Sequence, residues 1–197
     1  ILNAGFLQFD NQLSNQLRVV WGIRVEDFDQ VVGSLKQSDP RHVYNRVRDY
    51  LPGLNATYKV TNKTNFRVSA SQTVVRPEFR ELSTFQFFDF ELGSTVAGNT
   101  GLQRTKISNF DIRYEMYPRA GELITLGVFY KYFKNPIEAF FNPGTGGGSY
   151  NFVNADEANS FGAELEFRKK LDFDESLKNF TVQGNISYIY NRVSQIG

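Results

Sequence analysis

The side chains in this sequence that carry chemistry are mostly charged, and few belong to the types that serve catalysis or metal binding. The 197 residues include no cysteine and one histidine, His42. The absence of cysteine excludes a disulfide framework and a thiolate metal site, and a single imidazole cannot form a histidine relay. His42 follows Asp39, Pro40 and Arg41, a polar stretch typical of a solvated loop. We therefore expect no catalytic residue, no metal site, no cofactor and no enzymatic activity.

Two short motifs resemble ligand-binding loops but lack the residues that such loops require. Residues 144–149 read Gly-Thr-Gly-Gly-Gly-Ser, without the Gly-Lys-Ser or Gly-Lys-Thr ending of a phosphate loop. Residues 172–175 read Asp-Phe-Asp-Glu, without the spacing and the glycine of a calcium loop. We interpret the first as a loop and the second as a tight turn.

Charge and composition narrow the class of protein. Lysine and arginine total 22, aspartate and glutamate total 21, and the formal net charge is +1 with no basic block, so no nucleic-acid partner is expected. Only 41% of the residues are hydrophobic, yet 15% are aromatic, with 19 Phe and 10 Tyr. Many aromatic side chains on a polar chain indicate surfaces with one apolar and one wet side, as in strands that separate lipid from water. No run reaches the ~20 apolar residues of a membrane-spanning helix.

Apolar and polar residues alternate along several segments, which is the period of a strand with two different faces. In residues 65–75, Phe66, Val68 and Val74 fall on one face, and Arg67 falls on the other with its polar neighbours. A helix would mix these two sets. The same alternation predicts strands through residues 4–9, 17–25, 54–60, 109–117, 124–132, 161–168 and 182–190. We therefore predict an all-β protein of about eight strands, each near the ~9–11 residues that cross a bilayer at a tilt.

The predicted connections alternate between short and long. Short turns are expected at residues 11–15, 61–64, 118–122 and 172–176, and long links at residues 27–50, 76–106 and 134–159. This plan is typical of an antiparallel transmembrane β-barrel wall with short periplasmic turns and long extracellular loops. All six prolines (residues 40, 52, 77, 118, 136 and 143) are expected in connections or at strand starts, where no ladder hydrogen bond is lost.

Each face of the predicted wall has its own candidate role. On the apolar face, Tyr130, Tyr132, Tyr188 and Tyr190 are placed to form an aromatic girdle at the outer interface, although aromatic residues also occur in ordinary sheets. The other face carries Arg18, Arg24 and Glu26, and also Arg67, Asp111, Arg113, Glu115, Glu164, Glu166 and Arg168. In a wide barrel these groups either face water or a polar plug, or form a mutually neutralising lattice of ion pairs.

A family resemblance is carried by the segment Gln72-Thr73-Val74-Val75-Arg76-Pro77-Glu78-Phe79-Arg80-Glu81-Leu82. It resembles a signature of TonB-dependent receptors of the Bacteroidetes type, with Arg76, Pro77, Glu78, Phe79 and Glu81 as its central residues. Further segments agree in the same order: residues 49–55, Gly98-Asn99, Leu102, and residues 107–115, 121–123, 129–131, 135–138 and 162–166. The resemblance spans about residues 16–190, and it is specific for the family rather than for a substrate.

The resemblance implies a barrel of ~22 strands around a plug, of which these residues would form a stretch of wall. It implies import of a bulky nutrient (a siderophore, cobalamin or a glycan) across the outer membrane of a Gram-negative bacterium, with energy supplied through TonB. The implied partners are outer-membrane lipid, the plug, the remaining strands, TonB through an N-terminal region, and a surface lipoprotein. The whole of residues 1–197 is then expected to be a fragment of one transmembrane β-barrel domain, with the plug and the C-terminal strands outside it.

The signature also has a direct physical meaning. Proline cannot continue a ladder and restricts the residue before it, so Arg76-Pro77 is predicted to end a strand, as is Asn135-Pro136. The loop that follows Pro77 carries four phenylalanines: Phe85, Phe87, Phe88 and Phe90. These rings either contact an incoming ligand or pack the loop onto itself or onto the plug.

Two other architectures fit parts of the pattern. A complete small barrel of about eight strands, acting as an adhesin or a structural anchor, requires its first and last strands to pair with each other. A soluble β-sheet protein requires a partner sheet over the apolar face. The start at Ile1 and the end at residues 195–197, without a terminal aromatic residue, favour a fragment of a larger barrel.

Overall fold

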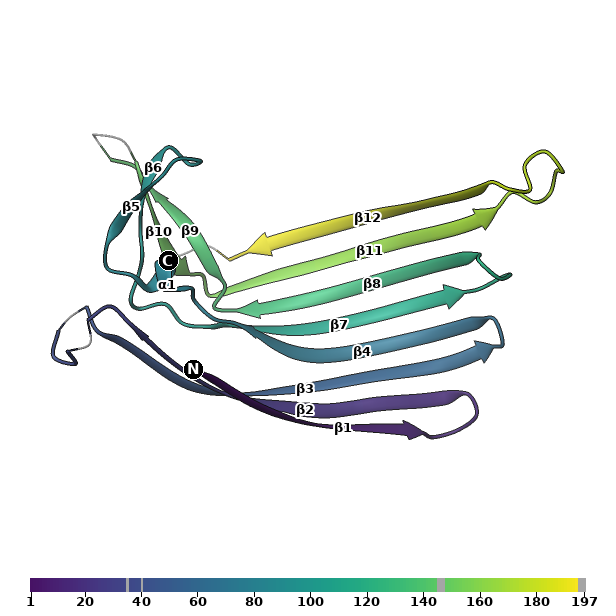
Figure 1. The fold of residues 1–197 in the computed structure, drawn as a ribbon, viewed down its shortest axis with the longest axis horizontal. Coiled ribbons are helices and arrows are strands. Elements are labelled where there is room, and N and C mark those ends of the chain that lie inside the picture. Colours follow the sequence, from purple (N-terminus) through teal and green to yellow (C-terminus); the bar gives the residue numbers. More distant parts are fainter. Residues whose placement is uncertain (35, 40, 145–147, 195–197) are drawn as a thin grey trace.

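The computed structural model describes residues 1–34, 36–39, 41–144 and 148–194. Eight strands form one antiparallel sheet in the order β1-β2-β3-β4-β7-β8-β11-β12 (Figure 1). Their bounds are β1 Leu2–Gln12, β2 Leu17–Val32, β3 Val43–Thr61, β4 Thr64–Val75, β7 Thr105–Met116, β8 Leu123–Lys134, β11 Glu157–Lys170 and β12 Thr181–Val193. In the described part of the chain, the structure has no helix whose length and apolar character would allow it to span a membrane.

Four short strands form a second sheet at one end of the first, in the order β5-β6-β10-β9. Their bounds are β5 Gln86–Asp89, β6 Ser94–Ala97, β9 Ile137–Asn142 and β10 Ser149–Asn154, and one helical turn, α1 (Phe79–Leu82), lies between β4 and β5. The pair β6–β10 is parallel, and it joins segments that are far apart in the chain.

The alternation is in register across the large sheet, so each face has one chemical character. One row of paired residues runs through Leu54, Ala70, Phe110, Tyr130, Phe161 and Tyr190. Directly paired residues of an antiparallel sheet project from the same face. We call this side the apolar face. It continues through Trp21, which pairs with Leu54 and stacks on Phe9 with ring centroids 4.7 Å apart.

The opposite side, the polar face, is equally consistent. A row on this side runs through Thr57, Arg67, Arg113, Gly127, Glu164 and Ser187. The predicted wall of eight two-faced antiparallel strands is therefore confirmed.

The connections are sorted between the two ends of the sheet. Turns 13–16, 62–63, 117–122 and 171–180 lie at one end, here called the turn end, and connections 33–42, 76–104 and 135–156 lie at the other, the loop end (Figure 1). Strand β1 begins and strand β12 ends at the loop end. As predicted, β4 stops before Arg76-Pro77 and β8 stops before Asn135-Pro136.

Several predicted boundaries are wrong. The link expected at residues 27–50 is mostly strand, because β2 continues to Val32 and β3 begins at Val43. Alternation is lost there because both faces carry charge, yet the ladder continues, with Asp27 paired to Arg48. Strand β3 has 19 residues and contains Pro52, which was expected in a connection or at a strand start. The turn expected at residues 172–176 occupies residues 171–180, and the links 76–106 and 134–159 contain the small sheet.

Strands β3 and β4 separate toward the loop end. Their pairing ends at Gly53 and Ser71, beyond which β3 pairs only with β2, and β4 only with β7. Pro52, which has no N–H to donate, lies next to the last pair, where a ladder toward β4 is no longer required. The outer half of the β2–β3 hairpin therefore diverges from the rest of the sheet (Figure 1). We call this interruption of pairing the split.

The segments 76–104 and 135–156, here called the loop package, pack against the diverging hairpin. Val43 of β3, Leu82 of α1 and Leu102 form a buried cluster, with Val32, Ile137 and Phe152 packed against it. Leu82 is fully buried. This small core holds the loop package to the wall.

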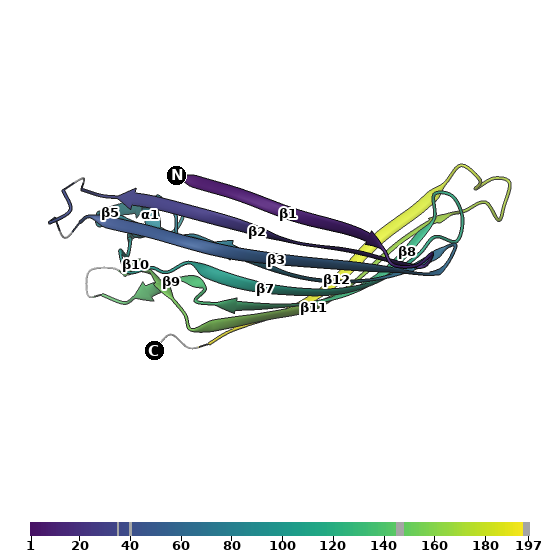
Figure 2. The same ribbon diagram turned by 90° about the horizontal axis from the view of Figure 1, so that it is seen from below.

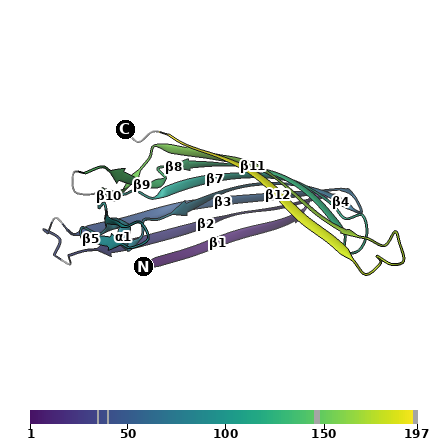
Figure 3. The ribbon, with the colours of Figure 1, turned by 90° about the horizontal axis from the view of Figure 1, so that it is seen from above.

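The large sheet is twisted and open. In Figures 2 and 3, β12 crosses the direction of β1, as the twist of strands requires over eight neighbours. Strands β1 and β12 occupy opposite edges, and the described residues show no pairing between them. A closed barrel of eight strands requires that pairing, so the structure does not favour the small-barrel architecture.

A cluster of charges joins two connections at the turn end. The Arg119 guanidinium contacts the carboxylates of Glu122 at 2.8 Å and Asp172 at 2.7 Å, and the Lys169 ammonium lies 3.0 Å from Glu122. The hydrogen bonds from Arg119 and then from Lys169 lower the pKa of Glu122 to about 2. Turns 117–122 and 171–180 are therefore fixed to each other.

This lowered pKa predicts a pH-dependent stability. An exposed glutamate has a pKa of about 4.3, so the contribution of Glu122 is present above that pH and is lost as the pH falls through about 2. The variant Glu122→Gln lacks this contribution. In urea titrations of the full-length protein in detergent, we expect the wild type to be more stable at about pH 6 and the difference to vanish near pH 2. A difference that is independent of pH would contradict this assignment.

The in-register apolar face predicts the effect of a charge placed on it. Val128 lies on this face, two residues along β8 from Tyr130 toward the turn end. The sequence predicts that Val128 contacts lipid. Val128→Lys is expected to destabilise the full-length protein by about 2–4 kcal/mol in lipid. The matched control is Ser187→Lys on the polar face, which should change the unfolding free energy little. Equal effects of the two variants, measured by urea titration in lipid vesicles, would refute the assignment of faces.

Candidate functional site

The signature arginine lies at the centre of a charged network that spans the split. One Arg76 nitrogen donates to the carboxylates of Glu26 on β2, at 2.8 Å, and Asp49 on β3, at 2.9 Å. Arg104, just before β7, donates to the second oxygen of Asp49 at 2.6 Å, and Arg24 donates to Glu26 at 2.6 Å. Cations and anions therefore alternate along a chain of five side chains.

Burial makes this network different from a surface ion pair. The side chain of Asp49 is 2% exposed and those of Glu26 and Arg76 are 10% and 15% exposed. The Arg76 guanidinium also lies over the Phe28 ring, 4.7 Å from its centroid, a favourable position for a cation on an aromatic face. Because each carboxylate contacts two guanidinium groups, desolvation of the charges is offset by several close contacts.

Sequence reasoning found only part of this network. The alternation predicts Arg24 and Glu26 on the charged face, and the resemblance includes Arg76 and Asp49, but nothing in the sequence connects the two pairs. Arg104 was missed, because it lies in a predicted long link with no alternation around it. These residues meet at the split. No local pattern in the sequence predicts the split.

The rest of the signature shapes the backbone. The Pro77 carbonyl oxygen accepts a hydrogen bond from the Gln30 amide at 3.4 Å. The Glu81 carboxylate accepts from the backbone N–H of Glu78 at 2.8 Å, which caps α1. Phe79 is exposed, whereas Leu82 anchors the turn in the core. These contacts are structural, and they connect the end of β4 to the loop package.

Other residues of the resemblance tie the two loop segments together. The Asn99 side chain donates to the Phe152 carbonyl oxygen at 3.0 Å, and the Asn154 side chain donates to that of Asn135 at 2.9 Å. Gly98 is tightly packed, since a Cβ there would lie 2.3 Å from the Ser83 carbonyl oxygen. The loop package is therefore a cross-linked unit.

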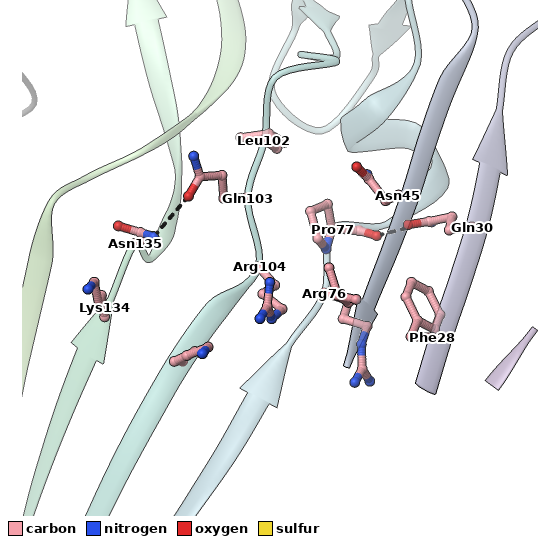
Figure 4. Close-up of a pocket in the computed structure, with 12 residues that line it drawn as sticks. Phe28, Gln30, Asn45, Arg76, Pro77, Leu102, Gln103, Arg104, Lys134 and Asn135 are labelled. Atoms are coloured by element: carbon pink, nitrogen blue, oxygen red, sulfur yellow. Dashed lines mark hydrogen bonds between the residues drawn. The ribbon is translucent and has the colours of Figure 1, made fainter. Parts of the chain in front are cut away.

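Two pockets adjoin the network. The first, of about 330 Å³, lies at the split between Phe28 and Gln30 on one side and Arg104 and Lys134 on the other (Figure 4). The second, of about 570 Å³, lies between the outer ends of the polar face and the loop package. Phe133 and Ser160 line its wall side, and Glu81 and Ile137 line its loop side.

The four loop phenylalanines lie on or beside β5, and three of them are exposed. Phe85 is 63% exposed, Phe88 53% and Phe90 89%, and the rings of Phe88 and Phe90 meet edge to face at 5.2 Å. Phe87 is half-buried beneath the Arg80 guanidinium, 5.4 Å from its ring centroid. Three of the four rings therefore point away from the protein as described, while Phe87 packs within the loop.

By their register, the charged residues predicted to face the lumen all lie on the polar face: Arg67, Asp111, Arg113, Glu115, Glu164, Glu166 and Arg168. Within this set, in the described chain, Arg67 and Glu115 form the one ion pair, at 3.1 Å. The other five residues of this set are exposed. That this face meets a plug or a water-filled passage stays a prediction.

The geometry does not assemble a reaction centre from the described residues. They contain no group of three or more His, Asp or Glu side chains placed to hold a metal ion. The Nδ1 atom of His42 lies 2.6 Å from the Ser34 carbonyl oxygen, so this ring closes the 33–42 loop. Part of the glycine-rich motif (residues 145–147) and the end at residues 195–197 lie outside the described residues.

Residues 2–196 match the family described as TonB dependent receptor-like, beta-barrel. The chain belongs to this family. A search of curated protein sequences finds no match.

Solved receptors share the fold of this family member. The siderophore receptor PirA from Pseudomonas aeruginosa is 17% identical, with a TM-score of 0.74 over 98% of this chain and 34% of that chain. The copper transporter OprC is 13% identical, with a TM-score of 0.74 over 97% of this chain and 29% of that chain. A ferric enterobactin receptor variant from Pseudomonas aeruginosa, in complex with enterobactin, is 17% identical, with a TM-score of 0.68 over 96% and 27%. The chain thus spans about a third of such a receptor or less.

The buried network of this receptor wall predicts a strong effect of Asp49→Asn. The variant leaves Arg76 and Arg104 without their shared carboxylate, and breaking a buried pair costs about 3 kcal/mol or more. We expect residues 76–104 of the full-length receptor to lose protection in hydrogen–deuterium exchange. The control is Asp10→Asn, whose partner Arg18 is about half exposed, and which should leave that protection unchanged. Unchanged protection in Asp49→Asn would refute a clamping role.

Proposed function

We propose that residues 1–197 are a segment of the single barrel domain of a TonB-dependent transporter in the bacterial outer membrane. The observation that carries this proposal is the open, in-register wall of eight strands, with one apolar and one polar face and long connections at one end. Its two free edges require further strands, because an unpaired strand cannot face lipid. The remaining strands and a plug would come from other parts of the receptor.

The cargo that we propose is a bulky, scarce nutrient: a siderophore, cobalamin or a glycan. A large polar ligand is supported by the 570 Å³ pocket beside the polar face and by the exposed aromatic rings of the loop package. Two of the structural neighbours are named for siderophores or enterobactin, and one for copper. Those names suggest a metal chelate as the first class to test.

Within this function, each part of the chain has a physical task. The apolar face contacts lipid and the polar face presents hydrated charges to the passage. The network around Arg76 holds the loop package at the mouth, where Phe85, Phe88 and Phe90 offer ring faces to a ligand. Energy would enter through the plug and TonB, which contact parts of the receptor other than this segment.

The exposed rings make ligand capture testable. We expect the triple variant Phe85→Ala, Phe88→Ala and Phe90→Ala to reduce uptake at limiting ligand by about tenfold or more, because each lost aromatic contact is worth about 0.5–1.5 kcal/mol. The measurement is uptake of a ⁵⁵Fe-labelled siderophore panel by cells that express the full-length receptor, with labelled cobalamin and maltooligosaccharides as further cargoes.

The matched control removes exposed rings from the opposite end of the wall. Phe173 and Phe180 lie in the 171–180 turn and are 76% and 60% exposed. Alanine at both positions should leave uptake unchanged. Equal uptake by the triple variant and the wild type would remove the rings from ligand capture, and a deletion strain that takes up every cargo normally would overturn the transport proposal.

A further inference from the structure

Two lysines face each other on the apolar side of the sheet at its loop end. Lys106 of β7 and Lys134 of β8 are direct partners in the ladder, and both are exposed. Like charges placed directly opposite each other destabilise a sheet. In the described chain neither lysine forms an ion pair. The nearest candidate in register, Glu157, instead accepts a hydrogen bond from the Tyr132 hydroxyl at 3.1 Å.

The position of this pair matches the layering of a lipid. Phe110 and Tyr130 pair four residues away along the same strands and on the same face, a distance of about 13 Å. The row between them contains Ser108 and Tyr132. Moving toward the loop end, the surface therefore changes from apolar side chains, through a tyrosine, to two ammonium groups.

The lysines also line the 330 Å³ pocket at the split, together with Arg76 and Arg104 (Figure 4). None of the described residues that line this pocket is an aspartate or a glutamate. The charges of the two arginines are offset by Glu26 and Asp49, whereas those of the lysines are not. The pocket therefore carries an excess of positive charge.

Two residues that line this pocket each have a buried side-chain atom with no hydrogen-bond partner among the described residues. These atoms are the Gln30 side-chain oxygen, which needs a donor, and Nε of Arg76, which needs an acceptor. Gln30 is 7% exposed, so bulk water does not serve it. A phosphate monoester has oxygens that accept and, when singly protonated, an O–H that donates.

We propose that this pocket binds the phosphate monoester of an outer-leaflet lipid, with Lys106 and Lys134 carrying the countercharge. The acyl chains would lie along Phe110 and Tyr130 on the apolar face. This inference goes beyond the proposed transport function, since it concerns a lipid bound at the split and not the cargo. It requires the apolar face to contact lipid, but it does not depend on the nature of the cargo.

The test uses the full-length receptor, purified in detergent and stripped of lipid, with dioleoyl phosphatidic acid as the probe. Native mass spectrometry over a titration gives the dissociation constant. We expect the double variant Lys106→Gln and Lys134→Gln to weaken binding about thirtyfold, because each lysine near an anionic lipid contributes a factor of about five. The matched control, Lys63→Gln with Lys178→Gln, removes two lysines from turns at the opposite end and should bind as the wild type does.

Three results would overturn the proposal. The first is unchanged binding in the Lys106 and Lys134 double variant. The second is equal binding of dioleoylglycerol, which lacks phosphate and would indicate apolar contact alone. The third is displacement of phosphatidic acid by an equal concentration of inorganic phosphate, which would identify a site for a soluble anion. If the double variant does not fold, Lys134→Gln alone provides the same comparison, with an expected loss of about fivefold.

Discussion

A strand that faces lipid must satisfy its backbone through its neighbours, because no water reaches its N–H and C=O groups. In this wall the ladders run without a break across the rows that are apolar in every strand. The outermost such row runs through Leu54, Ala70 and Phe110, and the β3–β4 pairing ends one residue beyond it, at Gly53 and Ser71. The sheet opens only where its surface becomes polar. Side-chain contacts can therefore replace backbone hydrogen bonds between β3 and β4 only outside the apolar rows.

Beyond that row, ion pairs instead of backbone hydrogen bonds connect the two sides of the split. Arg76 and Arg104 come from the β4–β7 side of the split, and they reach Glu26 and Asp49 on the diverging hairpin. Arginine suits this task because its planar fork binds carboxylates and stacks on aromatic rings, as Arg76 does on Phe28. The signature residues of this chain therefore mainly join the two sides of the split and fix the loop package to the wall. Residues that distinguish one cargo from another should be sought among the exposed loop side chains, not within the signature.

The sequence predicted what depends on local pattern and missed what depends on distant pairing. Alternation identified all eight strands of the wall, and proline identified the ends of β4 and β8. It failed for residues 27–50, where Asp27 and Arg48 place charge on the face that is apolar lower down, although the ladder continues. The small sheet was also missed, because its strands have four to six residues and its parallel pair joins β6 to β10 across a long separation. Arg104 gave no signal, since its partner lies 55 residues away.

The two ends of the wall are held differently, and this difference indicates where the molecule can adapt. At the turn end, the ion pair of Arg119 with Asp172 fixes two connections to each other close to the sheet. At the loop end, the network fixes the base of the loop package, but β5 pairs with β6 alone over four residues, at the edge of the small sheet. Short edge strands with exposed side chains open at lower free energy than long central ones. Adjustment to a ligand should therefore be confined to the phenylalanine-bearing edge, while the wall beneath it keeps its register.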